Sequence, residues 1–539
     1  MRMTRPALLG LAQLGVLTFT VIDLASPQPW AVWLIAASAL AVVALGDAPA
    51  SLGMRRTAAV LALLTVALLP TLAAPGEVVE QGIRIGGLIS SILMSVALLS
   101  RAAQRVALLR QVVVALLEVP VRRRGLSMAL ATQLFGGFLG FAGISMLMEV
   151  ASQRPATAQE RLQCFRRISR GFAAANLWSP MFSNISILLA LSPGLSWARV
   201  FPLAVLLALA SLALGLALDR VHPVAGARAD GGDTEDAGNG GSVSTVSAMT
   251  PLGTVAAVRE ASAVGAGSSV GSIGLVRLAQ AVESGTPGTG TGTVTGTAGA
   301  GAGIAKPSDP APPLEGAGLA AVLRAAWPVF ACMCAVLTCV LGLSIAAHLP
   351  VAAIIIVAAP LGALVLAATL GPGPRGLRGA AGQLAADFRG LRPLAGEVRL
   401  LMASGCAGTV IAAAIPAAWT APLSAALAPY PVLGCLFLAS AVVLLSCTSV
   451  HPMLSGIVVA GAFPAAAMGL PPVAHVLTVL AGLGLAVTTT PFSVVSLSAS
   501  RFSGLPLLTV SMRANLGFAA LSTVLVGLLL GGAADYFPR

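Results

Sequence analysis

Long apolar runs, separated by short polar stretches, fill most of the chain. A helix that crosses the hydrocarbon core of a bilayer needs about 20 mainly apolar residues; several runs reach that length, and a few are shorter or interrupted. The pattern predicts an all-α polytopic membrane protein with about 10–12 transmembrane segments. The runs lie at 7–25, 30–46, 57–73, 83–100, 125–148, 171–192 and 198–218, and then at 319–347, 351–370, 399–420, 430–448, 451–470, 472–500 and 506–530.

The pattern changes between Asp219 and Gly318, where Gly, Ser, Thr and Ala dominate and no long apolar run occurs. The stretch 285–303, for example, reads GTPGTGTGTVTGTAGAGAG. Such a segment cannot bury enough apolar surface to offset the entropy of ordering it. The sequence therefore predicts a disordered cytoplasmic linker at 219–318 between two transmembrane halves, 1–218 and 319–539.

Because the linker composition predicts no packed structure, we expect the linker to be dispensable for folding. Deleting 232–312 should leave a protein that remains monodisperse in detergent, as measured by size-exclusion chromatography. Aggregation of the deletion variant, under conditions in which the full chain is monodisperse, would show that the linker contributes to the fold.

Composition and charge agree with a membrane protein. The chain is 57% hydrophobic and 9% charged, whereas soluble domains carry about 25% charged residues. The net charge of +12 comes from arginines, since Lys306 is the only lysine, and these arginines cluster between apolar runs. Membrane topology accounts for that distribution, so we expect no nucleic-acid partner. Most of the seven cysteines lie inside apolar runs, and no CxxC pair occurs, so we predict no metal site and no cofactor.

The N-terminal run has the features of a signal anchor. Arg2 and Arg5 precede the apolar run 7–25, which contains Asp23 and is not followed by an A-x-A cleavage motif. The next apolar run begins at once, at 30–46. A membrane-retained segment is therefore expected rather than a cleaved signal peptide.

The run 125–148 is basic on both sides. A single spanning helix would place one basic cluster outside, against the tendency of arginines to stay in the cytoplasm. A re-entrant hairpin, with its tip in the glycine-rich sequence LFGGFLGFAG at 134–143, would keep both clusters inside. The sequence favours the hairpin, and a plain helix remains the alternative. The flanking arginines are Arg101, Arg105, Arg110, Arg122, Arg123 and Arg124 before the run, and Arg154, Arg161, Arg166, Arg167 and Arg170 after it.

Two segments in different halves share a pattern of a hydroxyl residue before proline. The first is LWSPMFSNIS at 177–186, and the second is TTPFSVVS at 489–496. Proline lacks an N–H group and clashes with the preceding turn, so each segment should break its helix. Paired broken helices in corresponding positions of two halves are typical of transporter binding sites. A kink without a ligand, in which hydroxyl groups satisfy the freed backbone, is the alternative.

We therefore expect the side chains around the two prolines to bind the substrate. Their hydroxyl and amide groups can serve either the freed backbone or a bound solute. The predicted binding residues are Ser179, Pro180, Ser183, Asn184, Thr489, Thr490, Pro491, Ser493 and Ser496.

Two further residues are candidates for ion coupling or anion attraction. His451 lies in the stretch 446–456, which is a candidate for a second hairpin, and it is one of few titratable groups in a region without Asp, Glu, Lys or Arg from Leu400 to Ser500. Histidine titrates near physiological pH, so proton coupling is one hypothesis and a helix-end histidine is the other. Arg513 lies inside the last apolar run, where surface anchoring explains it less easily than it explains Arg501.

The order of these segments, with WSPMFSN and TTTPFS at the two breaks, resembles the ion transporter superfamily, which includes anion–sodium symporters, citrate and gluconate carriers and arsenite pumps. The resemblance implies two inverted halves, each with a re-entrant hairpin and a broken helix whose Ser-, Thr- and Asn-rich tips form the site. It covers the chain outside the linker. The Ser-Asn-Thr signature of the dicarboxylate carriers is not present, because Ile185 follows Ser183 and Asn184.

The expected function is secondary active transport of a small anionic solute by alternating access, by a multi-pass protein of the cell inner (plasma) membrane. The lipid bilayer and a small-molecule or ion substrate are the expected partners, and a homodimer is compatible with the sequence. No GxxxxGK[ST] motif occurs, so ATP hydrolysis by this chain is not expected. The alternatives are a membrane-embedded enzyme, which the absence of charged residues from 400–500 disfavours, and a non-transporting scaffold.

Overall fold

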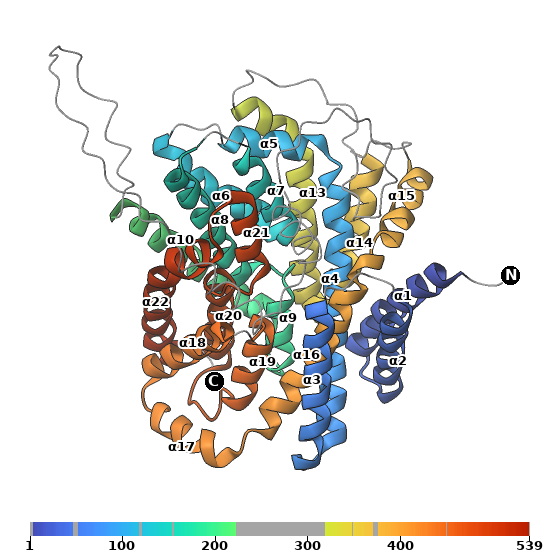
Figure 1. Cartoon of the computed structure of the whole chain (residues 1–539), viewed down its shortest axis with the longest axis vertical. Helices are drawn as coiled ribbons and strands as arrows, with labels where there is room; N and C mark the ends of the chain where they lie inside the picture. The colour runs from blue at the N-terminus through green and yellow to red at the C-terminus, as the bar shows by residue number, and fades with distance from the viewer. Residues whose placement is uncertain are drawn as a thin grey trace, which may run out of the picture.

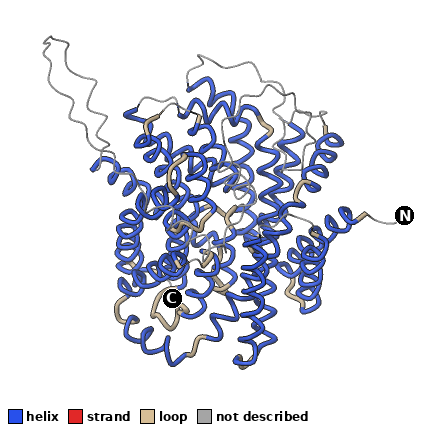
Figure 2. The backbone as a smooth tube through the Cα atoms, viewed as in Figure 1, coloured by secondary structure: helices blue, strands red, loops and turns tan. Residues whose placement is uncertain are grey.

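The computed structural model describes residues 4–46, 52–117, 121–153, 156–221, 319–347, 349–369, 376–448 and 450–537. Within these ranges the regular elements are all helices, without a strand (Figure 2). Seven helical stretches of the described chain are long and apolar enough to cross a membrane. Together with the composition, they identify an all-α membrane protein.

Helices lie at each apolar run expected from the sequence. Six of the seven long stretches correspond to α1 (Arg5–Ala25), α4 (Pro75–Gln104), α10 (Trp197–Val221), α14 (Val351–Thr369), α20 (Pro472–Thr489) continued by α21 (Val494–Ser503), and α22 (Ala514–Val526) with the π-helical turns η4 (Thr509–Arg513) and η5 (Gly527–Gly531). The seventh joins α15 (Leu377–Arg389), η3 (Arg392–Leu394) and α16 (Ala395–Ala414).

The remaining described helices complete the two halves. In the first half they are α2 (Pro29–Leu45), α3 (Leu52–Leu68) with η1 (Leu69–Thr71), α5 (Ala107–Leu117), α6 (Val121–Leu139), α7 (Phe141–Ser152), α8 (Ala158–Trp178) and α9 (Ser183–Ala190). In the second half they are α13 (Leu319–Ala346), α17 (Ala417–Leu427), α18 (Pro431–Cys447), α19 (Pro452–Ala462) and η6 (Ala534–Tyr536).

The two halves of the chain meet along α4 and α16, which run side by side (Figure 1). Small residues make this contact close: a Cβ atom added at Gly405 would lie 2.6 Å from the backbone nitrogen of Gly86. A Cβ atom at Gly82 would likewise lie 2.7 Å from Cα of Cys406. Small side chains allow helix backbones to approach in a membrane, where apolar burial alone does not drive association. This pair therefore forms a tight scaffold against which other helices pack.

A hairpin lies where the sequence predicts one. Gly140 separates α6 from α7 and has φ 58° and ψ −136°, a conformation that side chains other than glycine rarely adopt. Helix α7 folds back against α6 so closely that a Cβ atom at Gly143 would lie 2.1 Å from the carbonyl oxygen of Phe135. The run 125–148 is therefore two packed helices in this structure, rather than one straight helix.

The orientation of this hairpin in the bilayer remains a prediction. If α6 and α7 form a re-entrant hairpin, both ends face the cytoplasm, as the arginine clusters on both sides require. Single cysteines at positions 124 and 152 should then react with a membrane-impermeant thiol reagent from the same side of the membrane. Labelling from opposite sides would show that the segment crosses the bilayer.

The end of the first half differs slightly from the expected boundary. Helix α10 continues to Val221, so Asp219 lies inside the helix instead of at the start of the linker. Asp219 is buried because three arginines of α8 bind its carboxylate. The remainder of the predicted linker, 222–318, lies outside the described residues.

The second half also contains a pair of packed helices before its broken helix. Helix α18 ends at Cys447, and α19 begins at Pro452 and packs against α18. His451 is the N-cap of α19, where its side chain accepts a hydrogen bond from the backbone N–H of Met453. The break between these helices falls within the stretch 446–456 that the sequence indicates as a second hairpin.

Candidate functional site

Each half contains a helix that is broken at the predicted proline. In the first half, α8 ends at Trp178 and α9 starts at Ser183, with Pro180 between them. In the second half, α20 ends at Thr489 and α21 starts at Val494, with Pro491 between them. The proline ring prevents the helical hydrogen bond at its own position, which frees carbonyl groups of the preceding turn. Both prolines are buried, so these breaks lie inside the protein.

The residue before each proline makes the same two hydrogen bonds. Ser179 donates from Oγ to the carbonyl oxygen of Gly137 in α6 and accepts a hydrogen bond from the backbone N–H of Met181 at 3.2 Å. Thr490 donates from Oγ1 to the carbonyl oxygen of Ser446 in α18 at 2.9 Å. It also accepts a hydrogen bond from the backbone N–H of Phe492 at 3.2 Å. Each hydroxyl therefore fixes the chain after the break and ties it to the first helix of the preceding hairpin.

The two broken helices contact each other directly. A Cβ atom added at Gly484 of α20 would lie 2.8 Å from the carbonyl oxygen of Ala173 in α8. These residues stand six positions before Thr490 and Ser179, respectively. With a rise of 1.5 Å per residue, each break is about 9 Å along its helix from the contact. The contact therefore joins the two long helices that lead into the breaks.

Beyond the breaks, each short helix packs against the opposite half. Helix α9 contacts α19 and α20, and α21 contacts α7 and α8. The side-chain contact of Ser183 with the other half is to Sδ of Met453 in α19, 4.0 Å from Oγ. Each broken segment is thus held between the hairpin and the broken helix of the other half.

All nine predicted binding residues are buried, and most make local hydrogen bonds. Ser493 caps α21 by accepting from the N–H of Ser496 at 3.0 Å and donates to Oγ of Ser496 at 3.0 Å. Thr489 donates to the carbonyl oxygen of Leu485 at 2.8 Å. Among the described residues, no hydrogen bond joins Ser183 or Asn184 directly to Ser493 or Ser496. The close approach of these four side chains therefore remains a prediction.

The first break also contains polar atoms without a partner. Asn184 donates from Nδ2 to Oδ1 of Asn176 in α8 at 3.2 Å, but Oδ1 of Asn184 and Oγ of Ser186 are buried without a hydrogen bond from the described protein. If both amides were turned over, Asn176 would donate and Asn184 would present a free N–H instead. This pair can therefore offer a solute either an acceptor or a donor.

Two buried asparagines near the breaks are not among the predicted binding residues. Asn176 is one. In the sequence it is a polar residue inside the apolar run 171–192, eight positions before Asn184, and in the structure it is buried. Asn515 is the other: it is fully buried and donates from Nδ2 to the carbonyl oxygens of Thr488, at 3.2 Å, and Val510, at 3.1 Å. It thereby satisfies a carbonyl that the break after α20 leaves free.

His451 and Arg513 have different surroundings. Nδ1 of His451 accepts the N–H of Met453 at 3.3 Å, which is the arrangement expected of a helix-end histidine. Arg513 is exposed at the end of η4. Neither placement tests a role in coupling or anion attraction. The described residues contain no group of three or more His, Cys, Asp or Glu that could hold a metal ion.

We expect the cap at His451 to be measurable. Replacing it with alanine should lower stability by about 0.5–2 kcal/mol, because the N–H of Met453 would lose its acceptor. Asparagine is a good N-cap residue, so His451→Asn should retain most of that stability. Thermal unfolding of both variants in detergent compares them, and equal melting temperatures for alanine and asparagine variants would rule out the cap.

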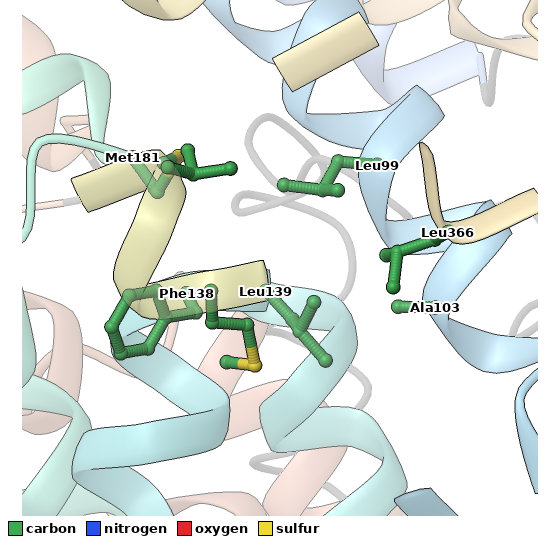
Figure 3. A pocket seen from close by; sticks show the side chains of 8 residues that line it. Leu99, Ala103, Phe138, Leu139, Met181 and Leu366 are labelled. Atoms are coloured by element: carbon green, nitrogen blue, oxygen red, sulfur yellow. The ribbon is translucent and has the colours of Figure 1, made fainter. Parts of the chain in front are cut away.

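A small cavity reaches the first break from the side of α4 (Figure 3). Its volume is about 10 Å³, which is room for a single water molecule. Only apolar side chains line it: Leu99, Ala103, Phe138, Leu139, Met181, Met333, Val336 and Leu366. Such a cavity offers no hydrogen-bond partner to a polar solute, so it is a packing gap between the hairpin tip and α4, α13 and α14.

The arrangement offers neutral donors and acceptors at two buried breaks, on helices that contact each other, without a charged side chain on α9 or a metal-binding cluster in the described chain. Its hydroxyl and amide groups are of the kind that hydrogen-bond a polar solute. No protein-family model matches the sequence, and a search of curated proteins finds no match either.

Proposed function

We propose that this protein is a secondary transporter that binds a small anionic solute between the two broken helices and moves it by alternating access. One observation carries the proposal: Ser179 and Thr490 make equivalent hydrogen bonds beside Pro180 and Pro491, on helices that contact each other through Gly484 and Ala173. Two buried breaks with the same local geometry, on helices that contact each other, are the arrangement expected of a transporter site.

The order of elements supports an internal repeat. Helices α6 and α7, the broken helix α8–α9, and α10 follow one another in the first half. Helices α18 and α19, the broken helix α20–α21, and α22 follow in the same order in the second half. In the proposed mechanism these two series are inverted repeats, and the pairs α6–α7 and α18–α19 are re-entrant hairpins. Alternating access then results from movement of this unit against the α4–α16 scaffold.

The preference for an anion rests on the donors at the breaks. The N-terminal ends of α9 and α21 carry backbone N–H groups and the positive end of each helix dipole. Serine hydroxyls at 183 and 496 can add further donors, and no acidic residue occurs in either short helix to repel an anion. Neutral donors of this kind bind an anion reversibly, which a transporter requires.

A ligand screen tests the proposal. The purified protein is heated in detergent with each member of a panel of organic anions and metalloid oxyanions, and the melting temperature is compared with that in chloride. At saturation of about 100 times the dissociation constant, a ligand adds about 2.7 kcal/mol to stability, which is readily measured. We expect one chemical class to stabilise the protein, and the same class to be taken up by proteoliposomes. Stabilisation without uptake would favour a non-transporting binding protein.

A further inference from the structure

A cluster of charged side chains joins α8 to the end of α10. We call Arg166, Arg167, Arg170 and Asp219 the Asp219 cluster. Arg166 and Arg170 donate to Oδ1 of the aspartate at 2.6 and 3.2 Å, and Arg167 donates to Oδ2 at 2.7 Å. Three cations thus share one anion, which leaves two positive charges in excess.

The third arginine of the cluster has other partners. Arg170 donates from Nε to Oδ1 of Asn515 at 3.2 Å and from Nη2 to the carbonyl oxygen of Ala514 at 2.9 Å. Its guanidinium carbon lies 4.8 Å from the ring centre of Phe518. Arg170 is therefore fixed by α22 and has little capacity for another ligand.

Arg166 and Arg167 have guanidinium N–H groups that donate to no other described residue. Within the described chain, Asp219 is the only acceptor that receives hydrogen bonds from Arg166 and Arg167. Nε of Arg166 is buried and has no partner there. A partly dehydrated guanidinium with unused N–H groups is costly unless an anion satisfies it. The side chains are 17% and 22% exposed, so a ligand can reach them.

Helix α6 borders the cluster. A Cβ atom at Gly125 of α6 would lie 3.6 Å from the guanidinium carbon of Arg167. The cluster therefore lies where α6, α8 and α10 meet, and its three arginines share the carboxylate of Asp219. Arg220, which follows Asp219 in the sequence, adds a basic residue to this end of α10.

We propose that the Asp219 cluster binds the phosphate group of an anion through Arg166 and Arg167. The planar guanidinium fork matches the oxygens of a phosphate, and two such forks can bind it together. If this end of α8 faces the cytoplasm, anionic phospholipid headgroups lie at the same level. Free phosphate offers the same oxygens, so the experiment separates the two sources. The inference does not depend on the transported solute.

The test uses the full chain reconstituted in nanodiscs and in detergent. Melting temperatures are compared in nanodiscs of phosphatidylcholine with and without phosphatidylglycerol, and in detergent during titration with inorganic phosphate. We expect phosphatidylglycerol to stabilise the wild type. The double variant R166Q/R167Q should lower the apparent affinity for phosphatidylglycerol at least about tenfold, because two charge-assisted contacts are lost. The matched control, R378Q/R389Q, removes two exposed arginines of α15 and should retain the full response.

The result with inorganic phosphate identifies the source: stabilisation by both ligands indicates a phosphate site, and stabilisation by the lipid alone indicates a headgroup site that also needs the acyl chains. If phosphatidylglycerol raised the melting temperature of the wild type and of R166Q/R167Q equally, the proposal would be overturned. If R166Q/R167Q does not fold, D219N decides. Removing the competing carboxylate should enlarge the response to phosphatidylglycerol, and a response that is unchanged or smaller would contradict the site.

Discussion

Replacing Ser183 and Ser496 together with alanine is expected to weaken solute binding about 5- to 100-fold, whereas each single replacement should weaken it only about 2- to 10-fold. The reason is that each hydroxyl contributes one neutral hydrogen bond, worth about 0.5–1.5 kcal/mol net. Both hydroxyls can donate to a solute. Ser183 donates only a long hydrogen bond, of 4.0 Å, to the sulfur of Met453, and Ser496 accepts from Ser493 without donating within the described chain. Binding is measured by titration with the anion that stabilises the wild type most.

The chain offers a matched control for this double replacement. Ser90 and Ser404 are also buried serines whose hydroxyls have no partner in the described protein, and they also come from different halves. They lie on α4 and α16, outside the two broken helices. Ser90→Ala with Ser404→Ala should leave the affinity unchanged. If the control weakens binding as much as the test pair, the effect comes from general loosening of the membrane domain.

The contact between the broken helices is the second place where a small change should have a large effect. At Gly484 a methyl group would lie 2.8 Å from the carbonyl oxygen of Ala173, which is backbone and cannot rotate away. Gly484→Ala should therefore force α8 and α20 apart and lower stability by about 1–3 kcal/mol. The larger Gly484→Val should cost more and should abolish solute binding, since both breaks are positioned by this contact.

Gly517→Ala is the control for that change. Gly517 lies in α22, and a Cβ atom there would meet nothing within 4 Å. Alanine is a better helix former than glycine by about 1 kcal/mol, so this variant should be as stable as the wild type or slightly more stable. Thermal unfolding and solute titration compare the variants. Equal stability of Gly484→Ala and Gly517→Ala would show that α8 and α20 do not pack as described.

Features that depend on local chemistry were predictable from sequence. Pro180 and Pro491 break their helices because a proline cannot continue the hydrogen-bond ladder, whatever surrounds it. The apolar runs predict helices because backbone groups in a bilayer must be satisfied within the segment. The glycine-rich stretch 134–143 similarly indicated the turn that the structure places at Gly140.

Features that depend on tertiary packing were not predictable. Asp219 follows an apolar run and precedes a linker, so its burial becomes clear only when three arginines of α8 surround it. The pairing of Asn176 with Asn184 requires that the chain turn at Pro180. The contact of Gly484 with Ala173 joins segments about 310 residues apart. The sequence around a glycine in an apolar run does not indicate which residue that glycine contacts.

Protection of two single cysteines by solute tests the central claim most directly. Cysteine is placed at Ser183 in one variant and at Ser496 in another, after the seven native cysteines are replaced. The rate of alkylation is then measured against the concentration of the stabilising anion. If both breaks form one site, the anion should slow alkylation at both positions with the same half-saturating concentration. Protection at only one position, or at clearly different concentrations, would contradict a site shared by the two halves.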